Sequence, residues 1–245
     1  MPEHVVVITG ASRGLGAGMA ECFAGMGLKL GLCARHRPEA PAGSEAFCEA
    51  VDVTDADAVA AFAEAVAQSL GPIDLWINNA GILEPIAPVR EIDSARFQQL
   101  LTINVLGVFN GSRTFVQHRR NHGGGGVLVN ISSGAALRGV AGWSAYCASK
   151  AAVDRLSEAL ALEEAGVGIR VLAVAPGVVD TEMQSTIRAT SEENFPSVER
   201  FRQMKASGHF NSPGFVAREL HAMAFDPARH SETVVVRVAN EWEQS

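Results

Sequence analysis

The sequence lacks the features that mark nucleic-acid-binding, membrane-embedded and secreted proteins. Over 245 residues it has a formal net charge of −7 and no long run of like charge, which argues against a nucleic-acid surface. No apolar stretch approaches the length of a membrane span. The first strand-like run, residues 5–9, begins so near Met1 that it leaves no room for a signal peptide. We therefore expect a cytoplasmic protein that binds a small molecule.

Cysteine and histidine show no pattern that points to a disulfide framework or a metal site. The seven histidines form no ligand spacing with cysteine or acid, so no metal is expected. The cysteines lack paired spacing, which favours free thiols in a reducing compartment. They are Cys22, Cys33, Cys48 and Cys147.

Hydrophobic residues make up 47% of the chain, enough for a large core, and the length favours one domain over residues 1–245 rather than two small ones. Short β-branched runs alternate with longer alanine-rich segments, which is the pattern of β–α–β units. Most runs are apolar throughout, as expected when helices cover both faces of a parallel sheet. The sequence therefore predicts an α/β, Rossmann-like, doubly wound parallel sheet of about seven strands. The expected strands lie within residues 4–10, 28–34, 46–54 (the weakest), 73–81, 125–133, 168–177 and 232–238.

Residues 181–212 interrupt this alternation. The segment is polar, rich in Ser, Glu and Arg, and follows the strand predicted at 168–177. Ligands of open α/β sheets bind outside the carboxyl ends of the strands, so an insertion there can shape a pocket. We interpret the segment as a mobile cover over a binding site; the alternative is an ordinary surface excursion.

A glycine-rich turn joins the first predicted strand to a helix. Gly10, Gly14 and Gly16 stand in TGASRGLG. Glycines there permit a tight turn and close backbone approach, while the helix N-terminus offers free N–H groups and a positive dipole to a pyrophosphate. The spacing differs from G-x-G-x-x-G, and three glycines alone are weak evidence. Their position directly after the first strand favours a dinucleotide site.

Two arginines favour NADP over NAD. An NAD-preferring site offers an acid to the adenosine ribose after the second strand, whereas this chain has Ala34 followed by Arg35. Together with Arg13 in the glycine turn, Arg35 has the planar guanidinium that suits a 2′-phosphate; the alternative is two solvated surface arginines. Asp52 is placed either to accept a hydrogen bond from the adenine amino group or to cap the following helix.

The chain has a single tyrosine, and a lysine follows it four residues later. On a helix, this spacing puts Tyr146 and Lys150 on one face. Alone, such a pair is often accidental, and the alternative is that Tyr146 packs while Lys150 is solvated. The pair belongs to an ordered set of motifs: TGASRGLG, NNAG at 78–81, Asn104, Ser133, YCASK at 146–150 and PGVVDT at 176–181. Over nearly the whole chain, this set resembles the short-chain dehydrogenase/reductase family.

The resemblance implies carbonyl reduction with NADP(H). Tyr146 would be the general acid that protonates the substrate carbonyl, and Ser133 would hydrogen-bond the same oxygen. Lys150 would bind the nicotinamide ribose and lower the pKa of the phenol, while Asn104 would anchor a water that links the lysine to solvent. The implied cofactor-binding residues are Gly10, Ser12, Arg13, Gly14, Leu15, Gly16, Arg35, Asp52, Val53, Asn79, Ala80, Gly81, Tyr146, Lys150, Pro176, Gly177, Val179 and Thr181.

Within that set, two positions carry more specific expectations. Thr181 would hydrogen-bond the nicotinamide carboxamide, beside a chain turn at Pro176 and Gly177. Asn79 resembles a residue near the adenosine, although its main role is expected to be holding strands together.

Three later stretches, residues 176–188, 201–208 and 212–220, resemble the sepiapterin reductase branch, including bacterial benzil-reductase-like members. This resemblance implies reduction of a ketone or vicinal dicarbonyl. Sepiapterin reductases fasten the pterin with an acid in the terminal strand, whereas this chain has Val235, Val236 and Arg237 there. The departure argues against a pterin as the natural substrate.

Substrate contacts are expected from Ser133, Trp143, Tyr146 and Met183. Trp143, Met183 and the cover would supply an apolar wall with few fixed charges; the alternative for Trp143 is a core or interface position. A homodimer is expected through the helices at 100–116 and 145–164. Two other function classes stay open: a non-catalytic NADP(H)-sensing protein, which requires no proton donor, and an NAD-linked alcohol dehydrogenase, with which Arg35 conflicts.

Overall fold

Seven parallel strands form a central sheet in the order β3-β2-β1-β4-β5-β6-β7. The structure is a computed structural model that describes residues 4–243. Each strand falls within a run that the sequence predicts, so the predicted fold class is confirmed. The strands are β1 (Val5–Thr9), β2 (Lys29–Ala34), β3 (Ala46–Ala50), β4 (Ile73–Asn78), β5 (Val127–Ile131), β6 (Arg170–Ala175) and β7 (Val235–Arg237).

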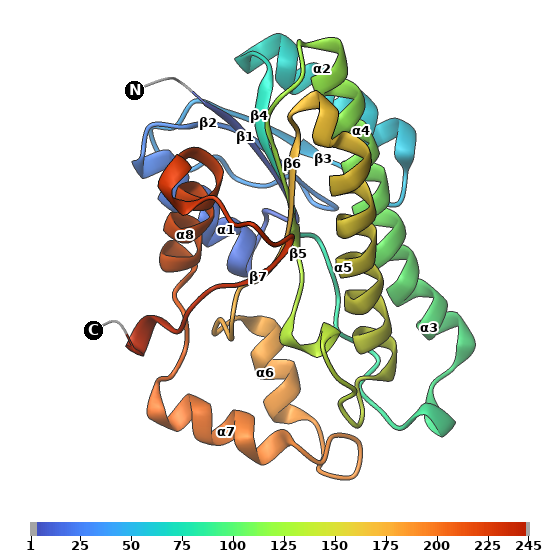
Figure 1. Ribbon diagram of the computed structural model, residues 1–245. Helices are drawn as coiled ribbons and strands as arrows, with labels where there is room; N and C mark the ends of the chain where they lie inside the picture. Colours follow the sequence, from blue (N-terminus) through green and yellow to red (C-terminus); the bar gives the residue numbers. More distant parts are fainter. Residues whose placement is uncertain (1–3, 244–245) are drawn as a thin grey trace.

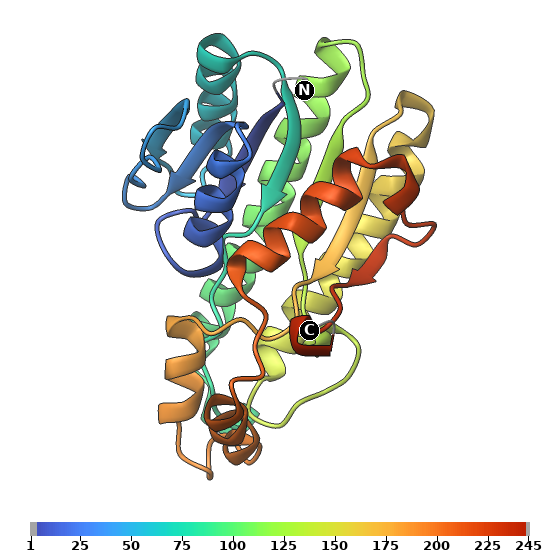
Figure 2. The same cartoon turned by 90° about the vertical axis from the view of Figure 1, so that its left-hand side faces the viewer.

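Helices cover both faces of the sheet (Figures 1 and 2). Successive residues of β1 alternate between two cores: Val6 and Ile8 belong to one, Val5 and Val7 to the other. The first core includes α1 (Gly14–Gly25) and α8 (Pro213–Phe225). The second includes α2 (Ala56–Leu70), α4 (Gly107–Asn121) and α5 (Ser144–Glu164). Burial on both faces explains why the strand sequences are apolar throughout.

The strand order changes direction at β1, which pairs with β2 on one side and β4 on the other. Because all pairings are parallel, the carboxyl ends of the strands meet at one edge of the sheet. Ligands of open α/β sheets bind outside that edge at the point where the order reverses. The turns after β1, β4, β5 and β6 carry the residues that the sequence singles out.

A π-helical turn, Thr102–Leu106, separates α3 (Ser94–Leu101) from α4. Such turns often occur at functional sites because the wider turn redirects a side chain. Asn104 lies inside it and is fully buried. None of the helices in residues 4–243 is long and apolar enough to cross a membrane.

Residues 181–212 contain more apolar packing than their composition indicates. They form α6 (Glu182–Ala189) and α7 (Val198–Ser207), which lie beyond the carboxyl ends of the strands (Figure 1). Ile187, Phe195 and Val198 are buried in one cluster with Trp143 and Tyr146. The segment therefore packs directly on the residues of the candidate site.

Candidate active site

The turn after β1 requires glycine at two positions for steric reasons. Gly10 has φ +67°, and a Cβ there would lie 2.7 Å from the Ala80 Cα. A Cβ on Gly16 would lie 2.3 Å from the Gly10 carbonyl oxygen. Helix α1 begins at Gly14, so Gly16 lies in its first turn, which has no acidic residue. The free N–H groups and the dipole of this helix end favour an anion. This cradle fits the pyrophosphate of a dinucleotide.

Asn79 ties the ends of β1 and β4 together. Its side-chain N–H groups donate to the carbonyl oxygens of Thr9 at 2.9 Å and Gly10 at 3.2 Å. The backbone N–H groups of Asn79 and Ala80 each donate to the Thr9 hydroxyl at 3.1 Å. These bonds hold the glycine turn against the turn that contains Ala80 and Gly81.

The structure places the two arginines differently. Arg35 is exposed directly after β2. Arg13 is also exposed, but it forms an ion pair with Glu182 at the start of α6. Sequence reasoning missed Glu182, because nothing in the chain signals a contact between residues so far apart. The pair links the nucleotide turn to the segment expected to cover the site.

Asp52 does not cap α2, which corrects one of the two alternatives for this residue. Its carboxylate accepts hydrogen bonds from the Thr54 N–H at 2.9 Å and the Thr54 hydroxyl at 2.8 Å. Asp55 is the N-cap, accepting from the N–H groups of residues 57 and 58. Val53 is buried, and its carbonyl accepts from the Asn110 amide at 2.9 Å.

Tyr146, Lys150 and Ser133 meet where β5 ends and α5 begins. The Lys150 Nζ lies 5.7 Å from the centroid of the Tyr146 ring and donates to the Ile131 carbonyl at 2.8 Å. The Ser133 hydroxyl lies near enough to the Tyr146 phenol to lower its pKa. The Ser133 hydroxyl also accepts from the Ala135 N–H at 3.1 Å. The predicted pairing of Tyr146 and Lys150 on one helix face is confirmed.

Burial dominates the ionisation of this pair. It raises the pKa of Tyr146 to about 12, although the Ser133 hydroxyl acts in the opposite direction. Lys150 is not among the groups that shift the phenol pKa in this structure, so its lowering of that pKa stays a prediction. Burial also lowers the pKa of Lys150 to about 8, with the charge of Asp154 opposing that shift.

Asn104 connects the π-helical turn to the chain after β4 and to α5. Its amide exchanges two hydrogen bonds of 2.8 Å with the backbone of Ile82. It also donates to the Ser149 hydroxyl at 3.2 Å, and that hydroxyl donates to the Tyr146 carbonyl at 2.8 Å. Asn104 thus reaches α5 between Tyr146 and Lys150, so all four predicted catalytic residues gather at one edge of the sheet.

Residues 4–192 match the family described as short chain dehydrogenase. The chain belongs to that family. A cis-4-hydroxycyclohexanecarboxylate dehydrogenase from Sinomonas cyclohexanicum is 37% identical over 79% of this chain and 82% of the relative. A benzil reductase ((S)-benzoin forming) from Bacillus cereus is 32% identical over 88% of this chain and 91% of the relative. The crystal structure of a 3-ketoacyl-(acyl-carrier-protein) reductase from Brucella melitensis complexed with NADH has a TM-score of 0.82 at 28% identity, covering 96% of both chains.

In this short-chain dehydrogenase, an aromatic cluster lies against the phenol. Trp143 packs edge-on to Tyr146 with centroids 5.7 Å apart, and it stacks on Phe195 at 4.8 Å. Phe201 and the half-buried Met183 pack on the same cluster. Trp143 is buried, as the core alternative expects, yet it also borders Tyr146. No periodic pattern points to Phe195 or Phe201, because both stand among polar residues.

Further contacts anchor residues 181–212 of the dehydrogenase at both ends. The Asp180 carboxylate pairs with Arg188 of α6 at 3.1 Å and with Lys205 of α7. The Asn211 amide donates to the Pro176 carbonyl at 2.9 Å. Neither Asp180 nor Asn211 was singled out from the sequence, because each acts through partners on other elements.

The end of β6 approaches the nucleotide turn. A Cβ on Gly14 would lie 3.4 Å from the Thr181 methyl group, so the two predicted cofactor regions are neighbours. Gly177 has φ +77°, and a Cβ there would lie 2.6 Å from the Asn211 amide nitrogen. The remaining predicted positions occupy the same edge: Ser12 is exposed, Leu15 is half-buried, and Pro176 and Val179 are buried.

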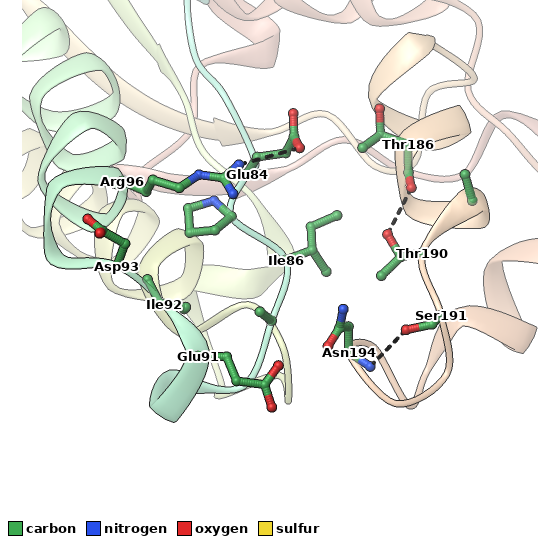
Figure 3. A pocket seen from close by; sticks show the side chains of 13 residues that line it. Glu84, Ile86, Glu91, Ile92, Asp93, Arg96, Thr186, Thr190, Ser191 and Asn194 are labelled. Atoms are coloured by element: carbon green, nitrogen blue, oxygen red, sulfur yellow. Dashed lines mark hydrogen bonds and ion pairs between the residues drawn. The ribbon is translucent and has the colours of Figure 1, made fainter.

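A cavity of about 540 Å³ opens between the chain after β4 and helix α6 (Figure 3). Its lining includes Ile86 and three carboxylates, Glu84, Glu91 and Asp93, with Arg96 3.9 Å from Glu84. The lining does not include Ser133, Tyr146 or Lys150. Its wall is nevertheless hydrogen-bonded to the loop before α5, because the Ala87 N–H donates to the Gly142 carbonyl at 3.0 Å.

Proposed function

We propose that this short-chain dehydrogenase is an NADP(H)-dependent carbonyl reductase that acts on a ketone or vicinal dicarbonyl. The observation that carries the proposal is the contact of one phenol with both a serine hydroxyl and a lysine at the carboxyl edge of the sheet. A protein that only sensed the nucleotide would not require this proton-donating arrangement.

The side chains divide the chemistry as follows. A nicotinamide cofactor held by the glycine turn after β1 would supply a hydride for the substrate carbon. Tyr146 donates its phenolic proton to the substrate oxygen, and Ser133 donates a hydrogen bond to the same oxygen. Lys150 stabilises the phenolate left behind, because its ammonium lies over the ring. With a phenol pKa of about 12, Tyr146 holds its proton at neutral pH and is available as an acid.

The preference for NADP(H) rests on Arg13 and Arg35. Both are exposed beside the nucleotide turn, and Ala34 leaves no acid to bind a free ribose hydroxyl. A 2′-phosphate would compete with Glu182 for Arg13, because guanidinium binds phosphate well. An NAD-linked alcohol dehydrogenase is the second candidate, favoured by the NADH in the related reductase structure and by the dehydrogenase named among the relatives.

The substrate is proposed to be apolar near its carbonyl and not anionic at its far end. Trp143, Phe195 and Met183 give the apolar surface beside Tyr146. A substrate that extends into the neighbouring cavity would meet Glu84 and Glu91, which disfavour negative charge. Residues 181–212 would act as the cover of this substrate site.

We also propose a homodimer through α4 and α5. An apolar groove of about 430 Å³ lies beside the π-helical turn and the adjoining parts of α4 and α5, lined by Leu101, Thr102, Val105, Leu106, Phe109 and Leu156. Leu106 and Phe109 are 43% and 45% exposed, which is unusual for large apolar side chains so close together. A cytoplasmic location remains a prediction of the sequence.

A substrate screen tests the proposed function. Purified protein is assayed with NADPH and with NADH against benzil, simple aromatic ketones, small aliphatic diketones, sepiapterin, a charged sugar and 4-oxocyclohexanecarboxylate. The proposal expects the highest kcat/KM for a neutral aromatic ketone or diketone with NADPH. A charged substrate with the highest kcat/KM would contradict the substrate class, and a preference for NADH would favour the second candidate.

A further inference from the structure

Three side chains of α5, spaced one helical turn apart, lie against residues 131–133 at the end of β5. Tyr146 lies beside Ser133, which lowers the pKa of the phenol, and Lys150 donates to the Ile131 carbonyl at 2.8 Å. The third side chain is Asp154, whose carboxylate accepts a hydrogen bond from the Ser132 hydroxyl. The first two belong to the proposed catalytic set, whereas Asp154 has no role in it.

Asp154 and Ser132 are both buried where they meet. Asp154 is 8% exposed and Ser132 is 3% exposed. The Ser132 backbone N–H donates to the Val174 carbonyl of β6 at 2.8 Å, so its side chain and main chain are held by different elements. A buried carboxylate costs free energy unless it is hydrogen-bonded, and this one bonds the residue that stands between Ile131 and Ser133 in the chain.

We propose that Asp154 is a positioning residue for the reductase: it fixes Ser132, and thereby Ile131 and Ser133, and it places a negative charge one helical turn from the Lys150 ammonium. This inference rests on the proposed function. Because residues 131 and 133 flank Ser132, a shift of Ser132 moves the acceptor of Lys150 and the partner of Tyr146 together. Asp154 therefore acts through other residues and does not itself touch the reacting atoms.

The local electrostatics agree with this role. Burial lowers the pKa of Lys150, and Asp154 is the charge that opposes the shift. Burial raises the pKa of Asp154; the Ser132 hydrogen bond opposes that rise, Glu158 adds to it, and Lys150 and Arg155 lower it. Within residues 4–243, the charged groups on other elements that pack against α5 do not contribute to the pKa shift of Lys150 or to that of Asp154. They include Arg96 on α3, Arg113 and Arg120 on α4, Arg170 on β6 and Arg237 on β7.

Two substitutions separate the charge from the hydrogen bond. Asp154→Asn keeps an acceptor oxygen for Ser132 and removes the charge. Ser132→Ala keeps the charge and removes the donor. Glu163→Gln is the matched control, because it removes a negative charge from an exposed position on the same helix.

The effect of the Asp154 charge on the ionisation of Lys150 can be measured without any substrate. The chain has only three lysines, Lys29, Lys150 and Lys205, so NMR of lysine labelled with ¹³C at Cε gives a simple spectrum. Lys150 is identified by titrating near pH 8, well below an ordinary lysine. Asp154→Asn should lower this midpoint by about 0.5 to 1 pH unit, while Glu163→Gln leaves it unchanged. An unchanged midpoint in Asp154→Asn would overturn the electrostatic part.

Kinetics test the positioning part. With a carbonyl reduced by the wild-type protein, Ser132→Ala should lower kcat on the order of tenfold with little change in KM for NADPH. Wild-type kcat in Ser132→Ala would overturn it. If no carbonyl is reduced but the Asp154→Asn midpoint shifts, the proposed function fails while the coupling of Asp154 to Lys150 stands. If the enzyme is active but neither the Lys150 midpoint nor kcat changes in these variants, the positioning role of Asp154 is refuted and the proposed function stands.

Discussion

Single residues set the pH range in which the proposed reaction runs. Tyr146 keeps its proton because burial raises its pKa to about 12. Lys150 is the group that changes charge in the working range, since burial lowers its pKa to about 8. The identity of this pair was predictable from the sequence, but its pKa shifts were not, because they depend on how much water the fold excludes.

Carbonyl reduction should therefore slow as the pH rises through about 8. Below that pH the ammonium is present and stabilises the phenolate formed by proton donation; above it the amine is neutral and the stabilisation is lost. Steady-state rates from pH 6 to pH 10 measure this fall in rate. Lys205→Arg, on α7, should show the same fall in rate. A wild-type rate that stays constant to pH 10 would contradict the assignment of Lys150.

Arg35→Ala should lower the preference for NADPH over NADH by about tenfold, because an exposed arginine–phosphate contact contributes a modest free energy. The measurement is kcat/KM for both cofactors. Arg37→Ala is the control, since Arg37 is exposed two residues further along the same segment. Equal effects of the two substitutions would show that Arg35 contributes only general positive charge.

At the scale of elements, the strands could be predicted from the sequence, because a sheet covered by helices on both faces requires continuous apolar runs. The segment at 181–212 was only partly readable. Its position after β6 indicated a cover, but its two helices depend on long-range contacts such as Asp180 with Arg188 and Lys205. The π-helical turn around Asn104 was likewise not foreseen, because it depends on bonds to Ile82 across the site.

Asp180→Asn should loosen this segment. The hydrogen bonds from Lys205 and Arg188 lower the pKa of Asp180, so its contribution to stability is present above the ordinary carboxyl pKa and is lost as the pH falls through the lowered one. Asp180 is about one-third exposed. We therefore expect a fall in Tm of only about 2–4 °C at pH 7.

The same substitution should raise KM for the carbonyl substrate more than KM for NADPH, because Asp180 holds α6 and α7, which we propose to cover the substrate. Thermal unfolding and steady-state kinetics measure the two effects. Glu199→Gln removes a carboxylate from an exposed ion pair within α7 and serves as the control. The same Tm and KM values in both variants would contradict an anchoring role for Asp180.

At the scale of the whole molecule, the parallel sheet explains why distant motifs form one site. The nucleotide turn follows β1, Asn79 follows β4, Ser133 follows β5 and Thr181 follows β6, and these strands end at one edge. That convergence could be predicted from the order of motifs. The acidic cavity could not be predicted, because its walls come from the chain after β4 and from α6 with the residues that follow it, which share no sequence signal.

The exposed groove beside α4 and α5 should bring two copies together. Phe109→Asp places a charge in the lining of that groove and should convert a dimer to a monomer in light scattering at micromolar concentration. Leu137→Asp changes an apolar residue that is 75% exposed outside the groove and should remain dimeric. A monomeric wild-type protein would contradict the proposed assembly.

The central claim is that Tyr146 donates the proton, and Tyr146→Phe tests it most directly. The phenylalanine ring keeps its packing against Trp143 but has no proton to donate. NADPH binding, followed by fluorescence, should stay close to wild type, while kcat with the carbonyl selected in the substrate screen falls at least about 10²-fold. Nearly normal turnover with Tyr146→Phe would contradict the account.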